Sequence, residues 1–326
     1  MEYQIMDQII HLLANGEEVI DMDEESFLLF AQDIQSNNLG MLNPRAPSVE
    51  ISIHGNEYTI HQSPSLLSSH RAGGTTGAVL WKITPLFAEW ITNPSNPLWT
   101  TSLLSQTSTV AELGTGISAL VALVLAPSVR HYIATDQEYV RKLFRTNLDA
   151  NASVGVSSSN SKAKGKSKGS KSSKSKSNST AKPADNVSFT TLDWETDQAA
   201  SLKDCVDSDD AHAQDEEEEE EDKGFDLLLS CDCIYNEALV APFVRTCAEI
   251  CRLRPAYVAG SEEPRPHRKP TVCIIAQQQR SPDVFETWLR ETMREFRVWR
   301  LSDDVLGEGL KSGSGYLVHL LLVRDK

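Results

Sequence analysis

The sequence lacks the features that mark secreted, membrane-spanning and zinc-binding proteins. Its six cysteines, at positions 205, 231, 233, 247, 251 and 273, form no C-x-x-C pair, and paired spacing is typical of structural zinc sites. The first ten residues have no basic start and no long apolar segment, which a secretory signal needs. No apolar run approaches the ~20 residues of a membrane-spanning helix. We therefore expect a soluble cytoplasmic protein, with the nucleus as the alternative compartment, that has reduced thiols and binds no metal.

Positive charge is also scarce. The chain has 31 lysines and arginines against 46 acidic residues, a formal net charge of −15. Direct nucleic-acid binding needs a basic face, so we do not expect it; the charge favours a basic protein partner. The eight histidines are scattered, and no Ser/His/Asp arrangement has supporting context.

The 326 residues fit one large domain with additions. We predict an N-terminal α/β extension over residues 1–72, with helices at 3–14 and 24–35 and two short strands within 49–61. The main domain is predicted over residues 73–326. Two tracts in it are too polar to offset their ordering entropy by burial. They are a Ser/Lys-rich tract at about 152–184 and a glutamate-rich tract at about 205–223, and we predict both to be disordered insertions.

The stretch from Val110 to Asp136 carries the clearest pattern. An apolar strand candidate runs into Gly114-Thr115-Gly116, the apolar stretch Ile117–Leu125 predicts a helix, and a second strand candidate ends at Asp136. A glycine turn lets the backbone approach a ligand closely, and a helix start offers free N–H groups. An acid after the second strand is placed to bind a ribose hydroxyl. The pattern favours a site for an adenosine-type cofactor.

Predicted strands and helices alternate through the rest of the chain. After Asp136 we expect helices at 138–150, 237–252 and 282–296, and strands at 187–194, 225–230, 271–277, 297–301 and 316–323. This order predicts a doubly wound, mostly parallel sheet with an antiparallel pair at its edge. Ligands of such sheets bind beyond the carboxyl ends of the strands. Glu112, Asp136, Trp194 and Asp232 fall at predicted strand ends, so we expect them to converge.

Other interpretations of the same residues remain open. Gly114-x-Gly116-x-x-Ala119, with an acid 22 residues beyond Gly114, also satisfies the dinucleotide fingerprint, so an NAD-type oxidoreductase is an alternative. Asp232 in the Asp-x-x-Tyr235 motif either caps the following helix or faces a substrate nitrogen. Trp194 and Trp81 are either core residues or contacts at the cofactor edge. A non-catalytic scaffold is a third hypothesis.

As a set, these motifs resemble a known family. The matching pieces are Gly-Ala-Val-Leu-Trp81, Ala-Glu112-Leu-Gly114-Thr-Gly116, Thr-Asp136-Gln, Leu-Asp-Trp194 and Cys-Asp232-Cys-Ile-Tyr235-Asn. They are similar to the seven-β-strand class I lysine methyltransferases with a D-x-x-Y motif, most of all to the fungal ribosomal lysine N-methyltransferase 5 family. The resemblance implies a Rossmann-like methyltransferase fold with a seven-stranded sheet. It also implies S-adenosylmethionine as methyl donor and, as substrate, a lysine on a protein of the large ribosomal subunit.

The resemblance also implies roles for residues at the cofactor. Gly114-Thr115-Gly116 would pass beneath it, and Glu112 would lie near its amino-acid end. Asp136 would bind the ribose hydroxyls, Trp194 would pack beside adenine, and Trp81 would close over the site.

The D-x-x-Y segment completes the expected site. Ser230 or Cys231 would make a backbone contact to the cofactor. Asp232 and Tyr235 are the catalytic candidates. Asp232 would orient the lysine amine or relay its proton, and Tyr235 would form a wall of the channel.

Overall fold

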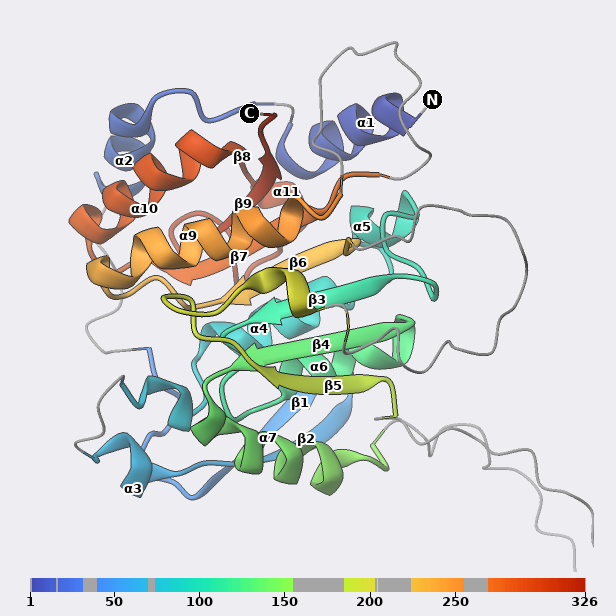
Figure 1. Cartoon of the computed structure of the whole chain (residues 1–326), viewed down its shortest axis with the longest axis vertical. Coiled ribbons are helices and arrows are strands. Elements are labelled where there is room, and N and C mark those ends of the chain that lie inside the picture. The colour runs from blue at the N-terminus through green and yellow to red at the C-terminus, as the bar shows by residue number, and fades with distance from the viewer. Residues whose placement is uncertain are drawn as a thin grey trace, which may run out of the picture.

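Seven strands form one sheet, which the computed structural model places in the order β5-β4-β3-β6-β7-β9-β8 (Figure 1). The strands from β3 to β7 are parallel, and β9 runs antiparallel to both of its neighbours, β7 and β8. The strands are β3 (Thr109–Leu113), β4 (His131–Asp136), β5 (Val187–Thr191), β6 (Leu227–Cys231), β7 (Val272–Gln278), β8 (Phe296–Arg300) and β9 (Tyr316–Val323). The predicted doubly wound sheet with an antiparallel pair at its edge is confirmed. The structure describes residues 2–15, 17–31, 40–69, 74–154, 185–202, 204, 224–254 and 269–325.

The sheet is buried on both faces, as its apolar sequence predicts. Side chains alternate between the faces of a strand, so Leu227 and Leu229 of β6 pack in one hydrophobic cluster and Leu228 packs in the other. Every residue of β3 and of β7 is buried. Such near-continuous burial is typical of a parallel sheet with helices on both sides.

Helices cover the two faces. The layer with Leu227 and Leu229 includes α1 (Glu2–Ala14), α4 (Ile83–Ile91), α6 (Leu120–Leu125) and α7 (Glu138–Asn151). The layer with Leu228 includes α2 (Met22–Phe30), α9 (Glu237–Cys251) and α10 (Pro282–Glu295). The remaining short helices are α3 (Pro64–Leu67), α5 (Pro97–Thr100), α11 (Asp303–Leu306) and the 3-10 turns η1 (Thr76–Ala78), η2 (Ala126–Ser128) and η4 (Ala199–Leu202). Among the described helices, none is long and apolar enough to cross a membrane.

The helix expected from Ile117 begins later than the apolar pattern indicates. Helix α6 starts at Leu120, and Ala119 before it has a left-handed backbone with φ +55°. The turn after β3 therefore extends from Gly114 to Ala119, and α6 has only six residues. The expectation that a helix start directly after Gly116 supplies free N–H groups is wrong. The amide of Gly116 instead donates to Asp136.

The N-terminal residues pack against several elements of the main domain. Helix α2 lies beside α10 (Figure 1). The backbone of Glu18 forms an isolated antiparallel β-bridge with Trp299 of β8. The hairpin of β1 (Ser48–Ile53) and β2 (Asn56–His61) packs on α7, where Asn147 and Asn151 bond to the backbone of β2. The division of the chain at residue 72 stays a prediction. Of the two tracts predicted to be disordered, residues 155–184 and 205–223 lie outside the described residues.

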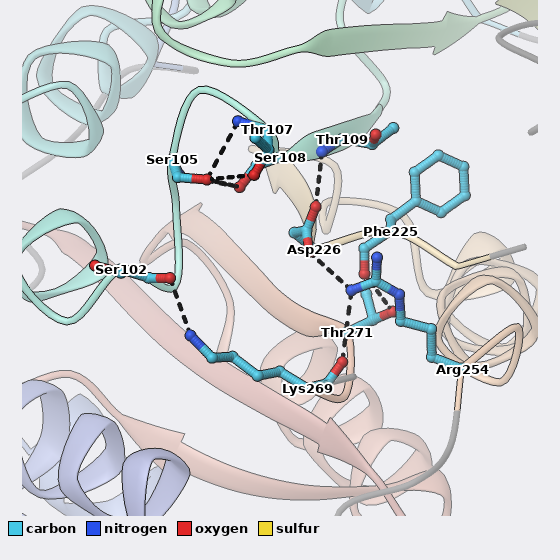
Figure 2. A network of polar contacts seen from close by, with 10 residues as sticks. All are labelled: Ser102, Ser105, Thr107, Ser108, Thr109, Phe225, Asp226, Arg254, Lys269 and Thr271. Atoms are coloured by element: carbon cyan, nitrogen blue, oxygen red, sulfur yellow. Dashed lines mark hydrogen bonds and ion pairs between the residues drawn. The ribbon is translucent and has the colours of Figure 1, made fainter. Parts of the chain in front are cut away.

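A polar network fixes the amino ends of the central strands (Figure 2). The Asp226 carboxylate accepts from the amide of Thr109 at 2.7 Å and from the guanidinium of Arg254 at 2.9 Å. The hydroxyl of Thr271 donates to the carbonyl of Phe225 at 2.7 Å. These bonds join the starts of β3, β6 and β7, at the edge opposite to the one where the predicted site residues lie.

Candidate active site

A cavity of about 530 Å3 lies at the carboxyl ends of β3, β4, β5 and β6. The strand order reverses at β3, which is where doubly wound sheets bind their ligands. Ten of the eleven site residues expected from the sequence line it: Trp81, Glu112, Gly114, Thr115, Gly116, Asp136, Trp194, Cys231, Asp232 and Tyr235. The eleventh, Ser230, is buried and donates its hydroxyl to the carbonyl of Leu113 at 3.0 Å. Segments that are far apart in the sequence therefore line one cavity.

The turn after β3 needs both of its glycines. Gly114 has φ +69° and Gly116 has φ +62°, a region that L side chains rarely adopt. A Cβ on Gly114 would lie 2.2 Å from the sulfur of Cys233. The amides of Gly114 and Thr115 donate to the carbonyl of Thr135 at 3.0 and 3.1 Å, which holds the turn against β4. The backbone here forms a bare floor that a ligand can approach closely.

Two acids stand beside this floor. Asp136 accepts from the amides of Gly116 at 2.8 Å and of Gln137 at 2.7 Å. Glu112 accepts from the hydroxyl of Tyr132 at 2.7 Å. Burial raises the pKa of Glu112 to about 7 and the pKa of Asp136 to about 6. Because burial disfavours the charged carboxylates, a cationic group placed between them would be attracted and would restore their ionisation.

Asp232 is held differently from either interpretation of the sequence. The cap of α9 is Asn236, whose side chain accepts from the amide of Ala238, so the capping interpretation of Asp232 is wrong. The carboxylate of Asp232 is fully buried, and Arg280 donates to its two oxygens at 2.6 and 2.5 Å. The amide of Gln278 donates to it as well, at 3.1 Å. Asp232 therefore meets the cavity as half of a buried ion pair.

Arg280 extends this ion pair to the loop over the cavity. Its guanidinium lies over the ring of Trp81, 5.0 Å from the centroid. The indole N–H of Trp81 donates to the carbonyl of Thr76 at 3.1 Å, and the hydroxyl of Thr76 donates to that of Tyr235 at 2.9 Å. These contacts link Asp232, Trp81 and Tyr235. Arg280 was not among the site residues predicted from the sequence, because it lies 48 positions from Asp232.

Trp194 supplies an aromatic wall. Its ring meets Phe243 edge-on with centroids 5.0 Å apart, and it lies 3.5 Å from a Cβ built on Gly114. Its buried indole N–H has no acceptor in the part of the chain that the structure describes. A buried donor without an acceptor is costly, so this N–H suits a polar ligand in the cavity.

Fifteen further residues line the cavity and were not among the predicted site residues. They include Thr84, Gln137, Tyr139 and Leu239. The position of Gln137, directly after Asp136, was a signal that could have found it. Tyr139 had none, because its place in the wall depends on Gly77, where a Cβ would lie 2.9 Å from the Tyr139 hydroxyl oxygen.

Comparison with known proteins gives similarity over most of the chain. Ribosomal lysine N-methyltransferase 5 of Zygosaccharomyces rouxii is 28% identical over 258 residues, which cover 74% of this chain and 72% of that protein. The chain is similar to the ribosomal lysine N-methyltransferase 5 proteins. Proteins of the same name from other species, among them Kluyveromyces lactis, match at 24–27% identity. No family model matches the chain.

A shorter match carries a different name. The diaminohydroxyphosphoribosylamino-pyrimidine deaminase of Schizosaccharomyces pombe is 35% identical over 134 residues, 41% of this chain, and the chain spans about a third (32%) of its length. The sequence here contains no H-x-E and no P-C-x-x-C motif, which form the zinc signature of nucleobase deaminases.

Among solved structures, the N-methyltransferase NodS of Bradyrhizobium japonicum, in complex with S-adenosyl-L-homocysteine, aligns with a TM-score of 0.34 and 12% identity. That alignment covers 71% of this chain and 90% of NodS.

Proposed function

We propose that this chain is an S-adenosylmethionine-dependent protein-lysine N-methyltransferase that modifies a protein of the large ribosomal subunit. The observation that carries the proposal is the convergence of Gly114, Asp136 and Trp194 on one cavity at the reversal point of the sheet. The names of the relatives supply the ribosomal lysine as substrate class. The alternative NAD-type activity makes a different prediction for ligand binding, which the experiment below uses.

The residues present fit the cofactor. The bare backbone of Gly114 and Gly116 would lie beneath it, and Asp136 would accept bonds from its ribose hydroxyls. Glu112 would balance the charge of the cofactor's ammonium group, because a positive neighbour favours the ionised form of the Glu112 carboxylate. The indole N–H of Trp194, which has no acceptor among the described residues, would gain a polar atom at the adenine edge. The backbone at Cys231 would contact the cofactor, whereas the Ser230 side chain serves to hold β6 on β3.

The reaction needs alignment and a neutral amine. The cofactor, when bound, supplies a methyl group on a sulfonium, a good electrophile, so the protein contributes mainly orientation. Deprotonating a lysine of pKa near 10.4 at pH 7 costs about 4–5 kcal/mol. A guanidinium disfavours a second positive charge nearby. Arg280 lies beside Asp232 and Trp81. We therefore propose that its positive charge favours the neutral form of the lysine amine.

Asp232 and Tyr235 are proposed to position the lysine. The carboxylate oxygens of Asp232 accept bonds from Arg280 and Gln278, so these contacts support an orienting role rather than a proton relay. Tyr235 is 38% exposed and is held by Thr76, which suits a residue at the mouth of a channel. Trp81 would close the opposite side.

A ligand comparison tests the cofactor assignment. A ligand that binds the folded state at a hundred times its Kd stabilises the protein by about 2.7 kcal/mol. We expect a thermal shift with S-adenosylhomocysteine and none with NAD. Gly116→Arg should remove the shift, because the side chain would fill the floor of the cavity and meet the Gly77 carbonyl, 3.4 Å from an ideal Cβ. A shift with NAD alone would overturn the proposal.

Transfer of labelled methyl groups tests the reaction. Wild-type protein, labelled S-adenosylmethionine and purified large-subunit ribosomal proteins should give one labelled band, with the label on lysine after hydrolysis. Asp232→Ala should lose transfer and keep the S-adenosylhomocysteine shift. Cofactor binding without transfer to any protein would favour the scaffold hypothesis.

We also propose that the protein resides in the cytoplasm and does not bind nucleic acid directly. The formal charge of −15 opposes contact with phosphates. Five described cysteines are free thiols, as expected in a reducing compartment. Fluorescence microscopy of a tagged chain would identify the compartment, and signal confined to the nucleus would contradict the assignment.

A further inference from the structure

An exposed apolar surface lies on α2, away from the cofactor cavity. Among the described residues, five large apolar or aromatic side chains are exposed, and three of them fall between residues 20 and 28. Ile20 is 81% exposed, Phe27 is 73% exposed and Leu28 is 51% exposed. Helix α2 buries Ser26 and Leu29 on its inner side, so Phe27 and Leu28 are not needed for the core. Exposed apolar residues gathered in one place mark interaction sites.

Carboxylates surround this surface. Ile20 and Leu28 line a second cavity, of about 460 Å3, together with seven acidic residues and a single cation, Arg300. The acidic residues are Glu17, Glu18, Asp21, Glu24, Glu25, Asp303 and Asp304. Arg300 is already paired with Glu25. Glu17, Glu24 and Asp304 have no ion-pair partner in the described parts of the chain, so the cavity keeps an excess of negative charge.

The surface adjoins the proposed lysine channel. Phe30, at the end of α2, lies 5.5 Å from Phe285, centroid to centroid, and the side chain of Gln279 donates to the carbonyl of Leu29. Phe30 and Tyr235 line one small cavity together with Arg280. Phe30 follows Leu28 by two residues, so the exposed residues of α2 lie next along the chain to the wall that Phe30 shares with Tyr235.

We propose that Ile20, Phe27, Leu28 and the carboxylates around them form a docking surface for a basic segment of the protein substrate. This α2 surface takes a lysine- or arginine-rich segment that also carries an apolar side chain. The apolar residues gain by burial against it, and the carboxylates attract its charge. Phosphate-bearing partners are repelled, and so is a second copy of this chain, which carries a charge of −15. The proposal rests on the proposed function for the identity of its partner.

Direct binding tests the surface without any enzyme assay. The probe is a fluorescein-labelled peptide of alternating lysine and leucine, and its counterpart is the same peptide with glutamate for lysine. We expect fluorescence anisotropy to show binding of the lysine peptide alone. The double change Phe27→Ser and Leu28→Ser should weaken it at least fivefold, as should Glu24→Lys. Leu12→Ser, at an apolar side chain that is 40% exposed on α1, and Asp149→Lys, on the exposed side of α7, are the matched controls and should have no effect.

Kinetics then connect the surface to the reaction. For purified large-subunit proteins as substrate, the Phe27/Leu28 double variant should raise KM about tenfold with kcat unchanged, while the S-adenosylhomocysteine shift stays that of wild type. Equal peptide binding by wild type and both α2 variants overturns the docking surface whatever the enzyme assay gives. A wild-type dimer in sedimentation that the double variant turns into a monomer also overturns it, since the occupant is then a second copy. If wild type transfers no methyl but the peptide result holds, the proposed function fails and the surface stands.

Discussion

The ion pair between Asp232 and Arg280 allows a quantitative test of the site. Arg280→Met removes both guanidinium bonds to a carboxylate whose side chain is 0% exposed and leaves it with the amide of Gln278. Removing one partner of a buried pair costs about 3–5 kcal/mol. The Arg280 side chain is 20% exposed, so water can reach part of the pair and we expect the low end, a loss of about 3 kcal/mol.

A second substitution separates charge from packing. Asn tolerates the left-handed backbone of Asp232, which has φ +64°, and it carries no charge that needs a partner. Asp232→Asn in the Arg280→Met background should therefore recover about 2 kcal/mol. Methyl transfer should stay low in the double variant, because neither the cation nor its stacking on Trp81 returns.

Urea unfolding of wild type, both single variants and the double variant gives the coupling energy. Residues without mutual contact add to within about 0.5 kcal/mol. A coupling energy below that value would refute the buried pair. If the Arg280→Met variant transferred methyl groups at the wild-type rate, the guanidinium would not be needed to lower the lysine pKa. That conclusion would hold even if the variant lost stability as expected.

Four further substitutions probe the buried acid, the glycine turn and the opposite edge of the sheet. Glu112→Gln should stabilise the ligand-free protein by on the order of 2 kcal/mol at pH 8. Burial raises the pKa of Glu112 from 4.5 to about 7, so its favourable contribution is complete below pH 4.5 and is lost as the pH rises through 7. The advantage of Gln should thus be much smaller at pH 5 than at pH 8, and the S-adenosylhomocysteine shift should shrink at every pH; an equal gain at pH 5 would contradict the reasoning. Gly114→Ala should cost about 2–4 kcal/mol in urea unfolding. Cys233→Ala should recover part of it by removing the sulfur that lies 2.2 Å from the new Cβ, and no recovery would contradict the clash. Arg254→Met should lower unfolding free energy by about 3 kcal/mol, because its side chain is 5% exposed beside Asp226, and a lost ligand shift would show that the amino edge also shapes the cavity.

The sheet could be predicted from the sequence because its strands have a recognisable apolar pattern. The run Phe225–Leu229 is apolar except for Asp226, and parallel strands buried on both faces have such near-continuous apolar runs. The start of α6 could not be predicted. The apolar run from Ile117 is compatible with a helix, and the left-handed conformation of Ala119 depends on the turn packing under Gly77, whose carbonyl accepts from Ile117. A local pattern cannot report such a contact.

The candidate site shows the same limit at the level of side chains. Residues at strand ends could be named because the topology brings those ends together. The partner of Asp232 could not, because Arg280 lies 48 positions away and the motif that contains Asp232 says nothing of it. The capping interpretation failed for this reason: an Asp before a helix is a common cap, but the left-handed backbone at Asp232 turns its carboxylate toward the end of β7.

The arrangement of charge explains how one edge of the sheet can serve both a cofactor and a basic substrate. Of the acids beside the glycine turn, Glu112 is buried and Asp136 is partly buried. Desolvation raises the pKa of both carboxyl groups, so a cationic ligand would favour their ionised forms. The acid of the D-x-x-Y motif is instead neutralised by Arg280, which keeps the lysine channel free of an attractive negative charge. Without Arg280, the Asp232 carboxylate would hold the substrate amine as an ammonium and raise its pKa, the opposite of what transfer requires. Negative charge that attracts the substrate is therefore useful only at a distance, on α2, where it acts on the flanking segment and leaves the target amine neutral.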